Sequence, residues 1–149
     1  MKQVIRLIPI VLLLIGMSAS ACIGGKKVIP PYKVKERKAE ILAADVIRYT
    51  VFEGKGEPVE LSDRIKVHYH GMLEDGSVFD SSFDRGESIV FPLGGLIKGW
   101  QVGLAEVTVG SKVRLVIPAA AGYGDRELPS IPAGSTLIFD IEVINIESE

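Results

Sequence analysis

The side chains best suited to chemistry in this sequence are aromatic and aliphatic, and they gather in a few short segments. These segments are residues 67–71, 78–82, 97–100, 121–124 and 137–140, and they include the single tryptophan of the chain, Trp100. Side chains of this kind line pockets for apolar groups, with a few polar side chains to orient the bound molecule. The sequence therefore predicts an apolar pocket, although Trp100 or Phe139 taken alone would suit a hydrophobic core equally well.

Other chemistries have less support. His68 and His70 project to one side of an expected strand, a spacing that could bind a metal, but no third Cys or acidic ligand is placed nearby, so we predict no metal site. Aspartate, histidine and serine are present without a Gly-x-Ser-x-Gly turn, which argues against covalent hydrolysis. Gly94-Gly95 lacks the Lys-Ser/Thr pair of a phosphate-binding loop. We expect no cofactor.

The elements that would position these residues are mainly strands, because apolar and polar residues alternate along four stretches. One strand is expected within residues 45–53, and a turn is expected at residues 74–76. Asp140 and Glu142 are expected to face outward. The residues expected to share a side of each strand are Ile47, Tyr49 and Val51; Ile65, Val67 and Tyr69; Val113, Leu115 and Ile117; and Leu137, Phe139, Ile141 and Val143.

Helical spacing is found only in residues 97–106, where Ile97, Trp100 and Leu104 recur on one face. Residues 39–44 could add a short helix. The predicted fold class is therefore α+β, with a bent antiparallel β-sheet wrapped around one short α-helix.

Residues 1–21 have the layout of a secretory signal peptide. Lys2 and Arg6 precede an apolar run over residues 7–17, and small residues follow before Cys22. The run is shorter than the roughly 20 residues that span a bilayer. Cys22 is the only cysteine, and its position resembles that of the lipid-modified first residue of bacterial lipoproteins. An ordinary signal-peptidase site after Ala21, giving a secreted protein, and an uncleaved anchor remain alternatives.

Residues 22–44 are interpreted as the anchor cysteine followed by a basic tether, and residues 45–149 as one domain. Residues 23–38 hold six basic residues and one acidic residue, a formal charge of +5, whereas residues 39–149 hold nine and eighteen, a formal charge of −9. The tether could bind anionic lipid head groups or could be a solvated linker. An acidic domain argues against nucleic-acid binding.

From about residue 45 to 146, the segments named above match, in order, the motifs of the FKBP-type peptidyl-prolyl isomerases, and the chain resembles that family. The resemblance implies a pocket floored by Trp100 and an Asp80 carboxylate held by Tyr69 and Arg85. It also implies that Tyr123 binds a ligand carbonyl and that the Ile97 N–H meets the substrate carbonyl. Ile89 and Leu128 stand where phenylalanine and histidine are frequent in the family.

The residues that the resemblance assigns to catalysis are Tyr69, Phe79, Asp80, Trp100, Tyr123 and Phe139. Leu96, Ile97, Ile89 and Leu128 are assigned to substrate binding, and Arg85 to support of Asp80.

The resemblance implies an enzyme that isomerises X-Pro bonds of exported polypeptides by binding a twisted amide in the apolar pocket. The alternative is a binding module that holds proline-containing segments with little turnover. Macrolides are the inhibitors that the family implies. We expect a monomer in the bacterial cell envelope, anchored to a membrane through Cys22 and facing the periplasm.

Overall fold

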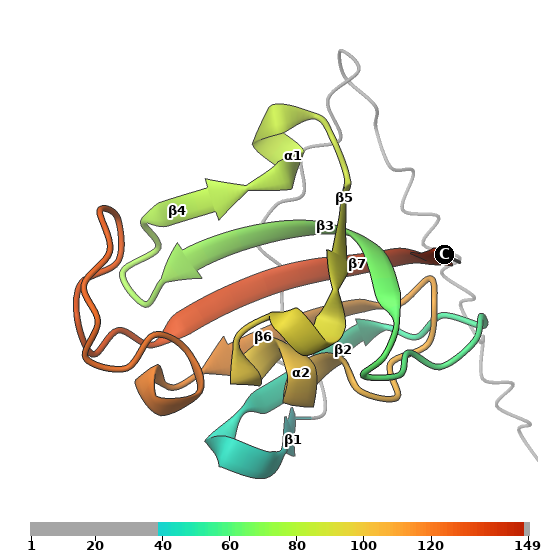
Figure 1. The fold of residues 1–149 in the computed structure, drawn as a ribbon, viewed down its shortest axis with the longest axis horizontal. Coiled ribbons are helices and arrows are strands. Elements are labelled where there is room, and N and C mark those ends of the chain that lie inside the picture. Colours follow the sequence, from blue (N-terminus) through green and yellow to red (C-terminus); the bar gives the residue numbers. More distant parts are fainter. Residues whose placement is uncertain (1–38, 148–149) are drawn as a thin grey trace, which may run out of the picture.

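The computed structural model describes residues 39–147, where seven strands form one antiparallel sheet with the helix α2 against one face (Figure 1). The predicted signal peptide, Cys22 and the basic tether up to residue 38 lie outside the described residues. The strands are β1 (Ala39–Ile41), β2 (Ile47–Phe52), β3 (Arg64–Leu73), β4 (Val78–Ser81), β5 (Ile89–Pro92), β6 (Lys112–Ile117) and β7 (Leu137–Glu147). The helices are α1 (Ser82–Arg85) and α2 (Lys98–Leu104), with single 3-10 turns η1 (Ala43–Asp45), η2 (Leu93–Gly95) and η3 (Ala119–Ala121). No helix in residues 39–147 is long and apolar enough to cross a membrane.

The strand order of the sheet is β1-β2-β6-β7-β3-β4, and β3 pairs with β5 as well, so it has three partner strands. One edge of β3 pairs with β7 along its whole length. The other edge pairs with β5 over residues 64–67 and with β4 over residues 70–72. The chain leaves the sheet between β4 and β5 to form α1 (Figure 1). This change of partner on β3 shapes the site described below.

The predicted alternation is confirmed in β3, β6 and β7, and the α+β fold with a short helix on an antiparallel sheet is confirmed as well. The expected turn is also present, because the Leu73 amide donates to Ser77 O and Gly76 adopts a φ of 86°. The residues predicted to face inward in these three strands are all at most 5% exposed: Ile65, Val67, Tyr69, Val113, Leu115, Ile117, Leu137, Phe139, Ile141 and Val143.

The expectation for Asp140 was wrong, because this aspartate is fully buried. Its carboxylate accepts two hydrogen bonds from Arg114 on β6, at 2.7 and 2.8 Å. Asp140 does lie on the opposite face of β7 from Phe139, as alternation requires. The bidentate ion pair supplies the partner that a buried carboxylate needs.

One further expectation near the start of the domain was wrong. Residues 39–44 do not form one helix, because Ala39–Ile41 is the edge strand β1, paired with β2, and only Ala43 and Ala44 belong to the 3-10 turn η1. In β2, Ile47, Tyr49 and Val51 do share a side, but Arg48 lies opposite the buried Leu115 and therefore faces the core. The one-turn helix α1 was also not predicted; its Ser81 side chain caps the Asp84 amide.

Helix α2 lies unusually close to β6 because glycines face that strand. A Cβ built on Gly99 would lie 2.3 Å from the Ile117 side chain, and one built on Gly103 would lie 2.5 Å from Leu115. Both neighbours are fully buried and cannot move into solvent. The glycines therefore set the distance of α2, and of the Trp100 indole it carries, from the sheet.

We expect Gly99→Ala to destabilise the protein by about 1–3 kcal/mol, because overpacking at Ile117 outweighs the roughly 0.5–1 kcal/mol that alanine gains in a helix. Urea unfolding of Gly99→Ala, Ile117→Ala and the double variant would measure this. The double variant should cost less than the sum of the two single variants, because removing the Ile117 side chain removes the clash. Additive costs, or a neutral Gly99→Ala, would contradict the close approach.

Candidate active site

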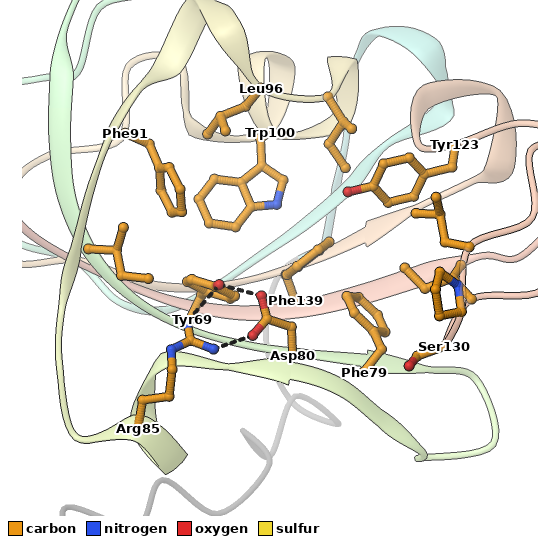
Figure 2. Close-up of a pocket in the computed structure, with 15 residues that line it drawn as sticks. Tyr69, Phe79, Asp80, Arg85, Phe91, Leu96, Trp100, Tyr123, Ser130 and Phe139 are labelled. Carbon is orange, nitrogen blue, oxygen red and sulfur yellow. Dashed lines mark hydrogen bonds and ion pairs between the residues drawn. The ribbon is translucent and has the colours of Figure 1, made fainter.

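An open cavity of about 810 Å³ lies between α2, β3, β4, β5 and the segment connecting β6 to β7 (Figure 2). The Trp100 side chain forms its floor: only 4% of the residue is exposed, yet the ring faces the cavity. The lining residues are Tyr69, Phe79, Asp80, Arg85, Ile89, Phe91, Leu96, Ile97, Trp100, Tyr123, Leu128, Pro129, Ser130, Ile131 and Phe139.

The walls are aromatic rings packed edge to face. Tyr69, Phe91 and Phe139 surround Trp100 with ring centroids 5.6, 6.1 and 5.2 Å away and interplanar angles of 80–83°. Phe79 in turn packs against Phe139 at 5.4 Å and 85°. Edge-to-face pairs are the favoured geometry of aromatic rings, and each neighbour restricts the next. The rings therefore form an apolar wall in which each ring limits the movement of its neighbours.

A register shift in β4 turns two consecutive side chains toward the cavity. Gly71 of β3 pairs with Asp80, whereas the next residue, Met72, pairs with Val78, so Phe79 is the extra residue of a bulge. In a regular strand, Phe79 and Asp80 would face opposite sides. Gly71 leaves room for this arrangement, since a Cβ there would lie 2.7 Å from the Phe79 ring.

The polar side of the cavity is a cluster of Tyr69, Asp80 and Arg85. The Tyr69 hydroxyl donates to Asp80 Oδ2 at 2.5 Å, and Arg85 donates through Nη2 to the Tyr69 hydroxyl at 2.9 Å and through Nη1 to Asp80 Oδ1. The guanidinium also lies over the Tyr69 ring, 5.7 Å from its centroid. The three side chains therefore hold one another in place at the rim.

The same contacts determine how the cluster ionises. Desolvation opposes the Asp80 carboxylate, but hydrogen bonds from Tyr69 and Arg85 and the charge of Arg85 together outweigh it and lower the pKa of Asp80. Burial, followed by the bond to Asp80, raises the pKa of Tyr69, and the hydrogen bond to Asp80 raises that of Arg85. At neutral pH the cluster is an ionised aspartate between a neutral tyrosine and a charged arginine.

Ser82 fixes the backbone of Tyr69 where β3 changes partners. Tyr69 lies between the residues paired with β5 and those paired with β4, so no strand satisfies its amide and carbonyl on that edge. The buried Ser82 hydroxyl accepts from the Tyr69 amide at 2.8 Å and lies 3.2 Å from the Tyr69 carbonyl oxygen. One side chain thus replaces a backbone partner beneath the tyrosine.

Two donors near the floor are available to a ligand. Within residues 39–147, neither the Ile97 amide, at the N-cap of α2, nor the Tyr123 hydroxyl forms a hydrogen bond with another group. Gln101 holds the segment before α2 through its side-chain amide, which donates to Gly94 O at 3.0 Å and to Leu96 O at 2.8 Å. A carbonyl group entering the cavity could meet either free donor.

The structure brings all eleven sequence-predicted cavity residues together, including Ile89 and Leu128. Their chemical roles remain predictions. Phe91, Pro129, Ser130 and Ile131 also line the cavity and were missed. Alternation in β5 could have found Phe91, which faces the same side as Ile89, but no periodic pattern marks the other three.

His68 and His70 lie outside the cavity and hydrogen-bond with α1 and β4. Their Nδ1 atoms are 3.0 Å from Ser82 Oγ and 3.1 Å from Ser81 Oγ, and the His68 ring stacks on Phe83 at 4.5 Å. In residues 39–147, no group of three or more His, Cys, Asp or Glu side chains is arranged to hold a metal ion. Both histidines therefore help attach the β4–α1 segment to β3.

An apolar cavity with an aromatic floor, at the junction of a bent antiparallel sheet and one short helix, defines a small-ligand or peptide-binding α+β domain. Residues 55–144 match the family model described as "FKBP-type peptidyl-prolyl cis-trans isomerase". The chain belongs to this family.

Two individual relatives support membership of this family. The chain is 41% identical over 113 residues to the FKBP-type peptidyl-prolyl cis-trans isomerase FkpA of Escherichia coli strain K12, a match covering 76% of this chain and 42% of FkpA. It is 53% identical over 90 residues to the peptidyl-prolyl cis-trans isomerase FKBP15-1 of Arabidopsis thaliana, covering 58% of this chain and 59% of the relative. The match thus spans about two fifths of FkpA and three fifths of FKBP15-1.

Solved structures give the same result for the fold. The crystal structure of FkpA from Escherichia coli superposes with a TM-score of 0.72 at 40% identity, covering 76% of this chain and 54% of that one. AtFKBP13 gives a TM-score of 0.66 at 35% identity, covering 74% of this chain and 99% of that one.

We expect Arg85→Met to raise the pKa of Asp80, because the substitution removes a hydrogen bond and a positive charge while desolvation remains. A carbon-detected NMR titration of the Asp80 carboxyl would measure the change. Asp75 is an internal control, since its own lowered pKa arises from hydrogen bonds with Ser77. The same Asp80 pKa in the wild type and in Arg85→Met would contradict the role of Arg85 in lowering it.

The lowered pKa of Asp80 also determines how its contribution to stability depends on pH. The folded pKa of Asp80 lies below its unfolded value of about 3.9, so its stabilising contribution is present above that pH and is lost as pH falls through the folded pKa. In Arg85→Met the folded pKa moves toward the unfolded value, so this contribution should be smaller above that pH and its loss should be complete at a higher pH.

Proposed function

We propose that this protein catalyses cis-trans isomerisation of X-Pro peptide bonds. The observation that carries the proposal is the open cavity with Trp100 as its floor, where apolar side chains could surround the proline ring of a longer peptide. Membership of the FKBP-type family and relatives named as peptidyl-prolyl cis-trans isomerases support it.

The reaction requires a lower barrier, not a shifted equilibrium. Rotation about a peptide bond has a barrier of about 18–20 kcal/mol, whereas the cis and trans forms before proline differ by only about 0.5–1 kcal/mol. The transition state is a twisted amide that has lost resonance and has a smaller carbonyl dipole. A site that binds this form more strongly than the planar form accelerates rotation.

The cavity favours the twisted amide through its composition. The edge-to-face rings around Trp100 would surround the proline ring with apolar groups. Apolar surroundings favour the twisted amide over the planar one, because the twisted form is less polar. The Ile97 amide and the Tyr123 hydroxyl can bind carbonyl groups of the peptide and fix its orientation.

Asp80 has a positioning and electrostatic role in this mechanism. No proton is removed in the reaction, and the lowered pKa of Asp80 makes it a poor general base at neutral pH. Its carboxylate, held by Tyr69 and Arg85, borders the cavity in which the amide would lie, and the amide nitrogen gains basicity as it twists.

We expect Phe79→Ala to lower kcat/KM for an apolar-residue-Pro peptide on the order of tenfold, the effect of losing about 1.4 kcal/mol of contact in the transition state. Trp100→Leu, which keeps an apolar side chain in the floor, should also lower the rate. Phe52→Ala is the matched control, because Phe52 is 59% exposed and does not line the cavity.

Two results would decide the matter. A wild-type protein that does not accelerate isomerisation, or variants at Phe79 and Trp100 with the wild-type rate, would exclude the proposed activity. If the wild type binds the peptide tightly without turnover, the protein is the binding module considered as the alternative. A macrolide that competes with the peptide would show that both use the same cavity.

We further propose that the protein is exported and anchored in a bacterial membrane through a lipid on Cys22, and that exported polypeptides are its substrates. The basic start, apolar run and small residues before Cys22 support export, and the position of this single cysteine supports lipid attachment. The six basic residues of the tether would add attraction to anionic head groups.

Mass spectrometry of the mature N-terminus should find a diacylated or triacylated Cys22 in protein purified from bacterial membranes. The control Cys22→Ser cannot carry a thioether-linked lipid and should leave the membrane fraction. An unmodified Cys22 amine would contradict the anchor and would instead indicate a secreted protein.

A further inference from the structure

Arg48 is a charged side chain on the core side of the sheet. It lies in β2 opposite Leu115 of β6, two residues after the fully buried Val46. Only 15% of its side chain is exposed. Burial of a cation is unfavourable unless several partners compensate it.

The partners of Arg48 are the last carbonyl groups of α2 and a carboxylate on β1. Nη1 donates to Gly103 O and to Ala105 O, both at 3.2 Å, and Nη2 donates to Glu40 at 2.7 Å. The carbonyl groups at a helix C-terminus have no partners within the helix, and a positive charge there is favoured by the helix dipole. The last turn of α2 contains no basic residue of its own, so Arg48 supplies this charge from another strand.

The arginine also carries a cost that an apolar side chain would avoid. Its Nε is buried and has no hydrogen-bond partner in the part of the chain that the structure describes. The contacts of Nη1 and Nη2 must offset this loss. An apolar residue that only filled the space between β2 and α2 would bury no polar atom and would require no compensating hydrogen bonds.

Helix α2 carries the floor of the cavity at one end and is held by Arg48 at the other. Trp100 lies in its first turn, and the free Ile97 amide lies at its N-cap. The helix has only seven residues, so displacement of its C-terminal end moves the indole as well. Gln101 holds the preceding segment, and the Arg48 side chain holds the far end through its hydrogen bonds from β2.

We propose that Arg48 is a positioning residue for the isomerase reaction: by binding the C-terminal carbonyl groups of α2, it sets the depth of the Trp100 indole and the place of the Ile97 amide. Glu40 orients the guanidinium, so β1 belongs to the functional unit. The effect on turnover rests on the proposed function, whereas the effect on the indole does not.

The test uses Arg48→Met in the otherwise unchanged protein, with two readouts at a temperature where urea unfolding shows the variant to be folded. Trp100 is the only tryptophan of the chain, so emission wavelength and acrylamide quenching report on the floor directly. We expect a red-shifted emission, stronger quenching, and a kcat/KM lowered roughly threefold to tenfold, as a small misplacement of a binding group would produce. Arg64→Met is the matched control, since Arg64 is an exposed arginine on β3.

Two further variants keep the test decisive if Arg48→Met does not fold. Arg48→Lys retains the charge but has one nitrogen, so it should give intermediate emission and rate, and Glu40→Gln should produce a smaller change in the same direction. Lower stability with wild-type emission, quenching and kcat/KM in these variants would overturn the proposal and leave Arg48 a purely structural residue. If the wild type itself has no isomerase activity, the proposed function fails, and the emission and quenching of the variants decide the role of Arg48.

Discussion

The contact between α2 and β6 is the constraint on which the rest of the site depends. Gly99 and Gly103 let the helix backbone approach Ile117 and Leu115 more closely than any side chain would permit. That approach places the Trp100 indole within reach of rings from three different strands. A helix held further from the sheet would lift the floor and separate these edge-to-face contacts, so the cavity depends on the absence of two methyl groups.

The cavity combines an apolar interior with a charged rim, and the break in pairing along β3 accounts for the rim. Because β4 and β5 meet different parts of β3, the segment between them can carry Arg85 back toward Asp80. Ser82 satisfies the backbone that the break exposes. The charges compensate one another within this cluster, so an ionised carboxylate can border the cavity although desolvation opposes its charge.

The N-terminal edge of the sheet is tied to the site by polar contacts. Strand β1 provides Glu40, β2 provides Arg48, and the guanidinium of Arg48 reaches the end of α2. A basic segment with a formal charge of +5 precedes this edge, and residues 39–149 carry −9. Arg48 therefore links this edge of the sheet to the helix beneath the cavity.

The sequence by itself determined the class of fold, the inward residues of β3, β6 and β7, and the eleven predicted residues that line the cavity. Burial on one face of a strand produces an alternation of apolar and polar residues that is visible in the sequence. The cavity residues were identified through the resemblance to the FKBP-type family, which rests on the order of the motifs. The tertiary structure alone decided that Arg48 faces the core, that Asp140 is buried and that a bulge in β4 is what turns both Phe79 and Asp80 toward the cavity. Each of these depends on a partner distant in sequence, namely the end of α2, Arg114 on β6 and the bulged pairing with Gly71. The alternation of apolar and polar residues does not indicate such partners. The compensation of a buried charge and the register of a strand depend on how the elements pack in the folded protein.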